Sequence, residues 1–157
     1  MSRRVQIIMS PEEIRGFLGS EKTLILVSNG RGGFPHPMPM WFVADDDGSI
    51  RMTTFKKSQK VYNLRRDPRV TLLVESGETY EKLKGVALYA HAELVEDPDL
   101  ISDTLLRAAG TDLDAIPASS LEEMRKGVQG QVAKRIMIRC KPDRVVSWDH
   151  GKLGGVY

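Results

Sequence analysis

The stretch that decides the fold is MTTFKKSQKVYNLRRDPRV, residues 52–70. It begins at the end of residues 49–54, in which polar and apolar residues alternate as in a half-buried strand. Val61 and Leu64 then lie at helical spacing, and Asp67-Pro68 ends the helix because the residue before a proline is disfavoured in the α region. The pattern therefore predicts a strand, a basic turn, a short helix over residues 58–66 and a buried strand at residues 70–74.

The chain before this stretch has the pattern of one helix followed by β-structure. Ser10-Pro11-Glu12-Glu13 is a capping-box start for a short amphipathic helix. Turn residues then separate β-prone segments, so we expect three strands in meander order. The expected strands lie at residues 23–28, about 37–43 and 49–54, with turns at residues 29–33 and 45–48.

The chain after this stretch predicts further strands and one insertion. A long strand is expected over residues 86–95, and Asp97-Pro98 starts a helix. Residues 99–130 mix Gly, Pro, Ser and charged residues, which indicates a surface insertion with a further helix around residues 120–126. Two last strands, residues 134–140 and 143–148, are expected on either side of Pro142.

Together these elements predict a mainly β (α+β) fold. About seven strands, two or three short helices and short connections are typical of a small antiparallel β-barrel. A doubly wound parallel sheet is disfavoured because it needs a helix after almost every strand. Neither of the phosphate-binding patterns GxGxxG and GxxxxGK[ST] occurs in the chain.

Composition bounds the class of protein. With 157 residues, 41% of them hydrophobic and 28% charged, the chain is expected to form a single domain over residues 1–157. A net charge of +2 is too small for bulk electrostatic binding to nucleic acid or to a membrane surface. One cysteine excludes an internal disulfide, and the scattered histidines suggest no metal site. Without an apolar leader or membrane span in the sequence, we expect a cytoplasmic protein.

The basic turn is a candidate anion site. Backbone N–H groups at the helix start, the Ser58 hydroxyl and the ammonium groups of Lys57 and Lys60 would converge on one point, as a phosphate monoester requires. The alternative is that the six basic residues between Lys56 and Arg69 form only a solvated helix face.

A second candidate is HPMPMW, residues 36–41. Alternating prolines confine a strand to an edge or to a ligand-facing position, and Met40 and Trp41 offer polarizable contact to a flat ring. Ordinary edge-strand packing is the alternative. Cys140 is expected to be a buried, inert thiol, and no Ser-His-Asp arrangement is evident. We identify no catalytic acid, base or nucleophile, which is the pattern expected when a bound cofactor supplies the chemistry.

Residues 53–70 resemble the pyridoxamine 5'-phosphate oxidase-like superfamily of split β-barrel flavin and deazaflavin enzymes. The resemblance covers roughly residues 10–96, returns at residues 134–148 and fails between about 99 and 130. It implies an FMN-binding-like antiparallel Greek-key split barrel whose Ser-x-Lys signature, Ser58-Gln59-Lys60, holds the cofactor phosphate. The cofactor-binding residues that it implies are Pro39, Met40, Trp41, Thr53, Thr54, Lys57, Ser58 and Lys60.

The resemblance also implies a function. The expected protein is an oxidoreductase that transfers hydride between coenzyme F420 or FMN and a small organic substrate, as a homodimer with the cofactor at the interface. Residues 63–68 and 147–149 look more like the F420-dependent branch, and Lys56, Lys57, Arg65, Arg66 and Arg69 could line a path for the acidic F420 tail. Residues 148–157 do not match the arginine-bearing substrate segment of the true oxidases, so vitamin B6 oxidation is not expected.

Two other functions are considered. A non-catalytic flavin or haem carrier of the same fold would need the same groove. Single-strand nucleic-acid binding by a basic barrel needs aromatic residues interleaved with the charges, and only Phe55 and Tyr62 accompany the basic run. We therefore expect no nucleic-acid partner.

Overall fold

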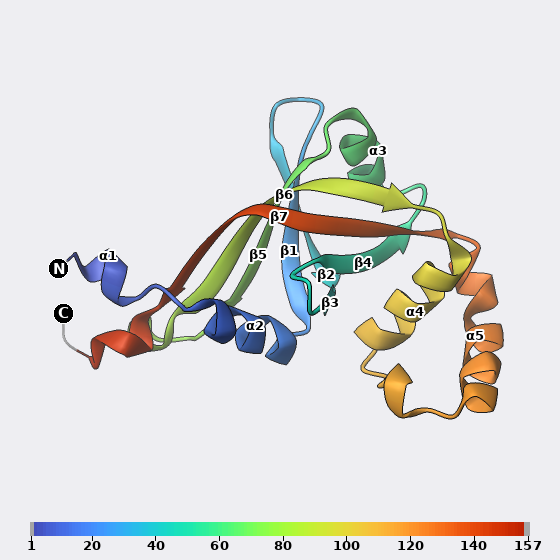
Figure 1. Cartoon of the computed structure of the whole chain (residues 1–157). Coiled ribbons are helices and arrows are strands. Elements are labelled where there is room, and N and C mark those ends of the chain that lie inside the picture. Colours follow the sequence, from blue (N-terminus) through green and yellow to red (C-terminus); the bar gives the residue numbers. More distant parts are fainter. Residues whose placement is uncertain (1, 156–157) are drawn as a thin grey trace.

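A computed structural model describes residues 2–155. Its centre is one sheet in the order β2-β1-β5-β6-β7-β4-β3, with every pair antiparallel, curled into a half-barrel (Figure 1). The predicted antiparallel split-barrel α+β fold is thus confirmed. The strands are β1 (Thr23–Asn29), β2 (Pro35–Trp41), β3 (Val43–Ala44), β4 (Ile50–Phe55), β5 (Arg69–Ser76), β6 (Lys84–Val95) and β7 (Arg135–Asp149).

The core lies inside the curl of the sheet. Alternate residues of β1, β4, β5 and β6 are buried there because successive side chains of a strand point to opposite faces. The helix α2 (Pro11–Ser20) closes one end of the core with Phe17 and Leu18. Its predicted capping box is present, with the Ser10 side chain accepting from the Glu13 amide and the Glu13 side chain accepting from the Ser10 amide.

The expected meander of the first three strands is wrong. The hairpin of β1 and β2 does form, but β2 is an edge of the sheet and β4 pairs with β7. The turn over residues 45–48 instead joins β4 to the two-residue strand β3. The chain therefore crosses the barrel between β2 and β4, and the last strand, not the second, becomes the neighbour of β4.

The two expected C-terminal strands form one strand, β7. A bulge at Asp143, opposite the step from Tyr89 to Ala90, absorbs the irregularity. Pro142 is tolerated because β4 pairs with β7 only up to Cys140, so at the proline β7 has a neighbour on one side alone.

The helices begin and end near the predicted signals. Asp67 ends α3 and the Asp97 carboxylate caps α4.

None of the helices in residues 2–155 is long and apolar enough to cross a membrane. Of the sequence's glycine-rich tail, Val156 and Tyr157 lie outside the described residues. Besides α2, the helices are α1 (Arg3–Gln6), α3 (Gln59–Arg66), α4 (Pro98–Ala108) and α5 (Ala118–Val132), with 3-10 turns η1 (Tyr80–Lys82), η2 (Leu113–Ala115) and η3 (His150–Leu153).

The segment expected as a surface insertion is a helical hairpin. The second helix is longer than the predicted residues 120–126, and both helices pack beside one end of the sheet (Figure 1). Ile101 of α4, Val132 of α5 and Met137 of β7 form a small core of their own between hairpin and sheet. We call α4, η2 and α5 together the helical hairpin.

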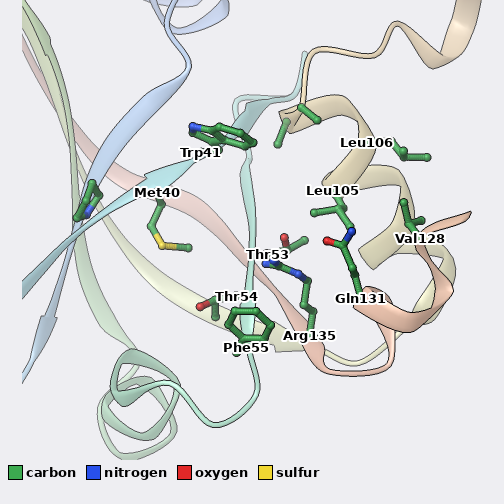
Figure 2. A pocket seen from close by; sticks show the side chains of 13 residues that line it. Met40, Trp41, Thr53, Thr54, Phe55, Leu105, Leu106, Val128, Gln131 and Arg135 are labelled. Carbon is green, nitrogen blue, oxygen red and sulfur yellow. The ribbon is translucent and has the colours of Figure 1, made fainter. Parts of the chain in front are cut away.

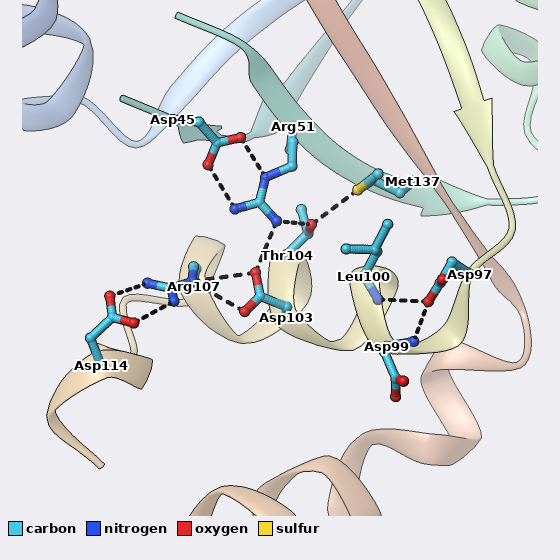
Figure 3. Close-up of polar contacts among 10 residues, drawn as sticks. All are labelled: Asp45, Arg51, Asp97, Asp99, Leu100, Asp103, Thr104, Arg107, Asp114 and Met137. Carbon is cyan, nitrogen blue, oxygen red and sulfur yellow. Dashed lines mark hydrogen bonds and ion pairs between the residues drawn. The ribbon is translucent and has the colours of Figure 1, made fainter. Parts of the chain in front are cut away.

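An ion-pair network holds this hairpin on β4 (Figure 3). The Arg51 guanidinium donates to both oxygens of Asp45, at 2.6 and 2.7 Å, and to Asp103 of α4 at 2.9 Å. Arg107 continues the network from Asp103 to Asp114. Only 13% of the Arg51 side chain is exposed, so these charges interact in a partly dry environment. The hydrogen-bonded carboxylates raise the pKa of Arg51 further.

We expect Arg51→Met to lower the free energy of unfolding by about 2–3 kcal/mol, because Asp45 would lose its cation and Asp103 would keep only Arg107. Chemical denaturation measures this change. The matched control is Arg139→Met in the opposite position of β7, whose pair with Glu93 is exposed and contributes less than about 1 kcal/mol. Equal losses for the two variants would contradict the anchoring role of Arg51.

Candidate functional site

A cavity of about 520 Å³ lies between β2, β4 and the helical hairpin (Figure 2). This volume is within the range of small-molecule sites, about 300–1,000 Å³. It brings together five of the predicted site residues: Pro39, Met40, Trp41, Thr53 and Thr54. The residues that prediction from sequence missed are Phe55, Leu105, Leu106, Ala108, Ala109, Val128, Gln131 and Arg135.

The β2 wall is an edge strand, as its prolines predict. Pro35, Pro37 and Pro39 occupy alternate positions, and alternate residues of an edge strand point their N–H away from the neighbouring strand. Proline at these positions therefore costs no ladder hydrogen bond. Trp41 ends the strand with 63% of its surface exposed, while Met40 is half-buried and directed into the cavity (Figure 2).

Lys60 is a buried cation without a counter-charge. Only 7% of the residue is exposed, and its Nζ donates to Thr54 Oγ1 at 3.1 Å. No carboxylate of residues 2–155 forms an ion pair with it. Burial lowers the pKa of the ammonium group, because a charged form loses hydration there. An anion from outside the chain is the partner that this arrangement lacks.

The start of α3 adds donors beside Lys60. Ser58 is the N-cap, yet its side chain accepts no hydrogen bond from the helix, unlike Ser10 of α2 and Asp97 of α4. Instead Ser58 Oγ lies 3.3 Å from Thr54 Oγ1. Thr54 therefore links the cavity to Ser58 and Lys60, the residues predicted to bind a phosphate. The N-terminus of α3 also favours an anion at this point.

The remaining basic residues of the run are placed differently. Lys57 is exposed and does not line the cavity. Lys56 and Arg65 pair with Glu96 at 3.2 and 3.7 Å, and Arg69 pairs with Asp67 at 2.7 Å. Arg66 donates to the backbone carbonyl of Asn29. Most of the cations suggested as a path for an acidic tail thus have partners within the chain.

Arg135 is the most informative residue that the sequence did not single out. It lies opposite Phe55 in the pairing of β4 with β7, with its guanidinium carbon 4.5 Å from the Phe55 ring centroid. Its Nε is buried without a hydrogen-bond partner, and burial lowers its pKa. Only the unexpected pairing of β4 with β7 brings this arginine to the cavity.

Other chemistry-bearing side chains lie elsewhere. Cys140 is buried in the barrel, where burial raises the pKa of its thiol to about 12, in agreement with the expected inert thiol. His91 forms an exposed pair with Asp143 at 2.7 Å and does not line the cavity. Within residues 2–155 no cluster of His, Cys, Asp and Glu could hold a metal ion.

The fold defines a split β-barrel protein, and the cavity lies on the outer side of β4, between that strand and the helical hairpin. A family model described as pyridoxamine 5'-phosphate oxidase matches residues 10–148, and the chain belongs to this family. The match includes the residues between 99 and 130 that the resemblance from sequence left out. No curated protein matches the chain.

Solved structures agree with this assignment. A conserved hypothetical protein from Mycobacterium tuberculosis is 37% identical, with a TM-score of 0.86 over 100% of this chain and 95% of that chain. An F420 reductase is 22% identical, with a TM-score of 0.63 over 87% and 98% of the two chains. A haem storage protein from Vibrio cholerae is 20% identical, with a TM-score of 0.65 over 88% and 94%. The last two share the fold.

We expect Lys60→Met to raise the free energy of unfolding of the ligand-free protein by about 1 kcal/mol at pH 7, because an uncompensated charge leaves the interior. In the wild type, the pKa of Lys60 in the folded protein lies below its value of 10.5 in the unfolded chain. At pH values between these two pKa values the unfolded state therefore binds more protons. Wild-type stability therefore rises with pH in this window, and the advantage of the variant shrinks there.

Chemical denaturation at several pH values measures both effects. Lys57→Met is the control, because removing an exposed ammonium changes stability by less than about 0.5 kcal/mol. A Lys60→Met protein less stable than the wild type at pH 7 would show that the hydrogen bond to Thr54 outweighs the burial of the charge.

Proposed function

We propose that the protein is an oxidoreductase that binds a flavin-type cofactor, coenzyme F420 or FMN, and reduces or oxidises a small organic substrate. The observation that carries this proposal is the buried Lys60 ammonium beside Ser58 and Thr54, together with the cavity that Thr54 lines with Met40 and Trp41. A phosphate-bearing ligand with a flat ring satisfies both features at once.

The residues have distinct roles in this proposal. Lys60 and Ser58 hold the phosphate, with Lys57 as an outer cation, and Thr53 and Thr54 contact the chain and ring of the cofactor. Pro39, Met40 and Trp41 contact the ring from β2. When bound, such a cofactor supplies the hydride chemistry, so the chain's own residues bind, orient and exclude water.

The fold comparison supports a redox function, because an F420 reductase shares this fold. It also keeps the carrier alternative open, because a haem storage protein shares it too. Among the described residues that line the cavity, Met40 is of a type that binds haem iron, and Met does so together with His in cytochromes c.

We further propose that residues 1–157 act as one domain in a cytoplasmic homodimer with the cofactor at the interface. Trp41 and Phe55 line the cavity with 63% and 53% of their surfaces exposed. A dimer is stabilised when large aromatic side chains that are exposed in one chain are buried against a second chain. Covering the cavity would also exclude the water that competes with hydride transfer.

Titration with FMN and with F420 tests the cofactor site. We expect Lys60→Met to weaken binding of whichever cofactor the wild type takes by about 10- to 100-fold, since a charge-assisted contact with phosphate contributes about 1.5–3 kcal/mol. Lys57→Met should have a smaller effect that disappears at high salt, because its exposed ammonium is screened. Unchanged affinity in Lys60→Met would remove this residue from the site.

Turnover separates the enzyme from the carrier. The cofactor that co-purifies from a host able to make both is identified by its spectrum and mass, and hydride exchange with added substrates is then measured. Tight binding without turnover of any substrate would favour the carrier.

Sedimentation tests the assembly. If two chains share the cofactor, dilution that dissociates the dimer also releases the cofactor, and bound cofactor strengthens the dimer. A monomer that binds cofactor at full strength would contradict the interface location.

A further inference from the structure

The cavity has a second polar feature, separate from the group of Ser58, Thr54 and Lys60. Arg135 and Gln131 both line it, and in Figure 2 their polar ends point toward the space between β4 and the helical hairpin. The rest of that wall is apolar and comes from α4 and α5. Its residues are Leu105, Leu106, Ala108, Ala109 and Val128.

Arg135 differs from the two arginines that anchor the hairpin. Arg51 and Arg107 each bind two carboxylates of the chain in the network that anchors α4. Arg135 forms no ion pair with any residue from 2 to 155, and its Nε is buried without a partner. Arg135 therefore has no counter-charge within the described residues, and an anionic ligand in the cavity would supply one.

The two uncompensated cations serve opposite faces of β4. Thr54 is buried on the core side with Lys60, whereas Thr53 and Phe55 point to the side of the helical hairpin, where Arg135 lies against the Phe55 ring. One anionic group held by Lys60 would therefore leave Arg135 free for another. Stacking on Phe55 also restrains the guanidinium, so less side-chain freedom is lost when a ligand binds.

We propose that Arg135, assisted by Gln131, binds the carboxylate of the substrate, and that the apolar wall of the helical hairpin covers the remainder of that molecule. This inference rests on the proposed function and adds the substrate class: a small apolar carboxylic acid. The guanidinium fork matches a carboxylate in two parallel hydrogen bonds. A single positive charge in an otherwise apolar wall suits a monoanion.

The test compares two probes of one shape, cinnamate and its neutral amide cinnamamide. Calorimetry measures their binding to the purified protein, both ligand-free and loaded with its cofactor. We expect cinnamate to bind the wild type at least 10-fold more tightly than cinnamamide. In Arg135→Gln this ratio should fall to less than 3-fold, while affinity for the cofactor stays within 2-fold of the wild type.

Two further variants serve as controls. Arg144→Gln removes an arginine that stacks on Tyr89 outside the cavity, so it should keep the wild-type ratio of the two probes. Lys60→Met should also keep the ratio while it loses cofactor affinity. Thermal unfolding verifies that each variant is folded before the affinities are compared.

Equal affinity of the wild type for the two probes, or no binding of cinnamate at millimolar concentration in either form, overturns the inference. So does an Arg135→Gln variant that loses as much cofactor affinity as Lys60→Met, since Arg135 would then belong to the cofactor site. A different result would contradict the proposed function, namely a wild-type protein that binds neither FMN nor F420. An Arg135-dependent preference for cinnamate would still support the inference in that case.

Discussion

The pairing of β7 with two neighbours at once is the constraint on which the rest of the structure depends. From Met137 to Asp149, β7 is hydrogen-bonded to β6, and its first part, Arg135 to Cys140, is hydrogen-bonded to β4. This second pairing brings β4 to the end of the sheet where the helical hairpin packs, and it sets Arg135 opposite Phe55. A shift of one residue in this register would turn Thr53 and Phe55 to the core and Thr54 away from Lys60.

Charged groups around β4 are arranged in two contrasting ways. At Arg51, the guanidinium and its carboxylates satisfy one another, and the result is a rigid support for α4. At Lys60 and Arg135, by contrast, cationic groups are partly or fully buried without an acid. Burial of such groups opposes folding, so the site stores an unfavourable term that an anionic ligand relieves. The ion-pair network of Arg51 acts in the opposite direction, because it stabilises the folded state.

Local signals predicted the local structure well, and the long-range pairings poorly. The capping box of α2, the Asp67-Pro68 end of α3 and the Asp97 cap of α4 each depend on neighbouring residues, and each is present. The order of strands depends on which strand edges remain available for pairing with segments far away in the chain. A short window of sequence carries no information about this. For the same reason Thr53 and Thr54 were predicted next to the basic turn, whereas Arg135 reaches the cavity only through a partner strand far away in the sequence.

The pairing of β4 with β7 also sets the order in which the protein matures. β4 and the start of α3 are synthesised about 80 residues before β7, the strand that completes the sheet around them. Until it docks, β4 has only the two-residue β3 as a neighbour, and Arg135 is absent from the cavity. Closing so long a loop is entropically costly and slow. The cavity is therefore incomplete until β7 has been synthesised and has paired with β4.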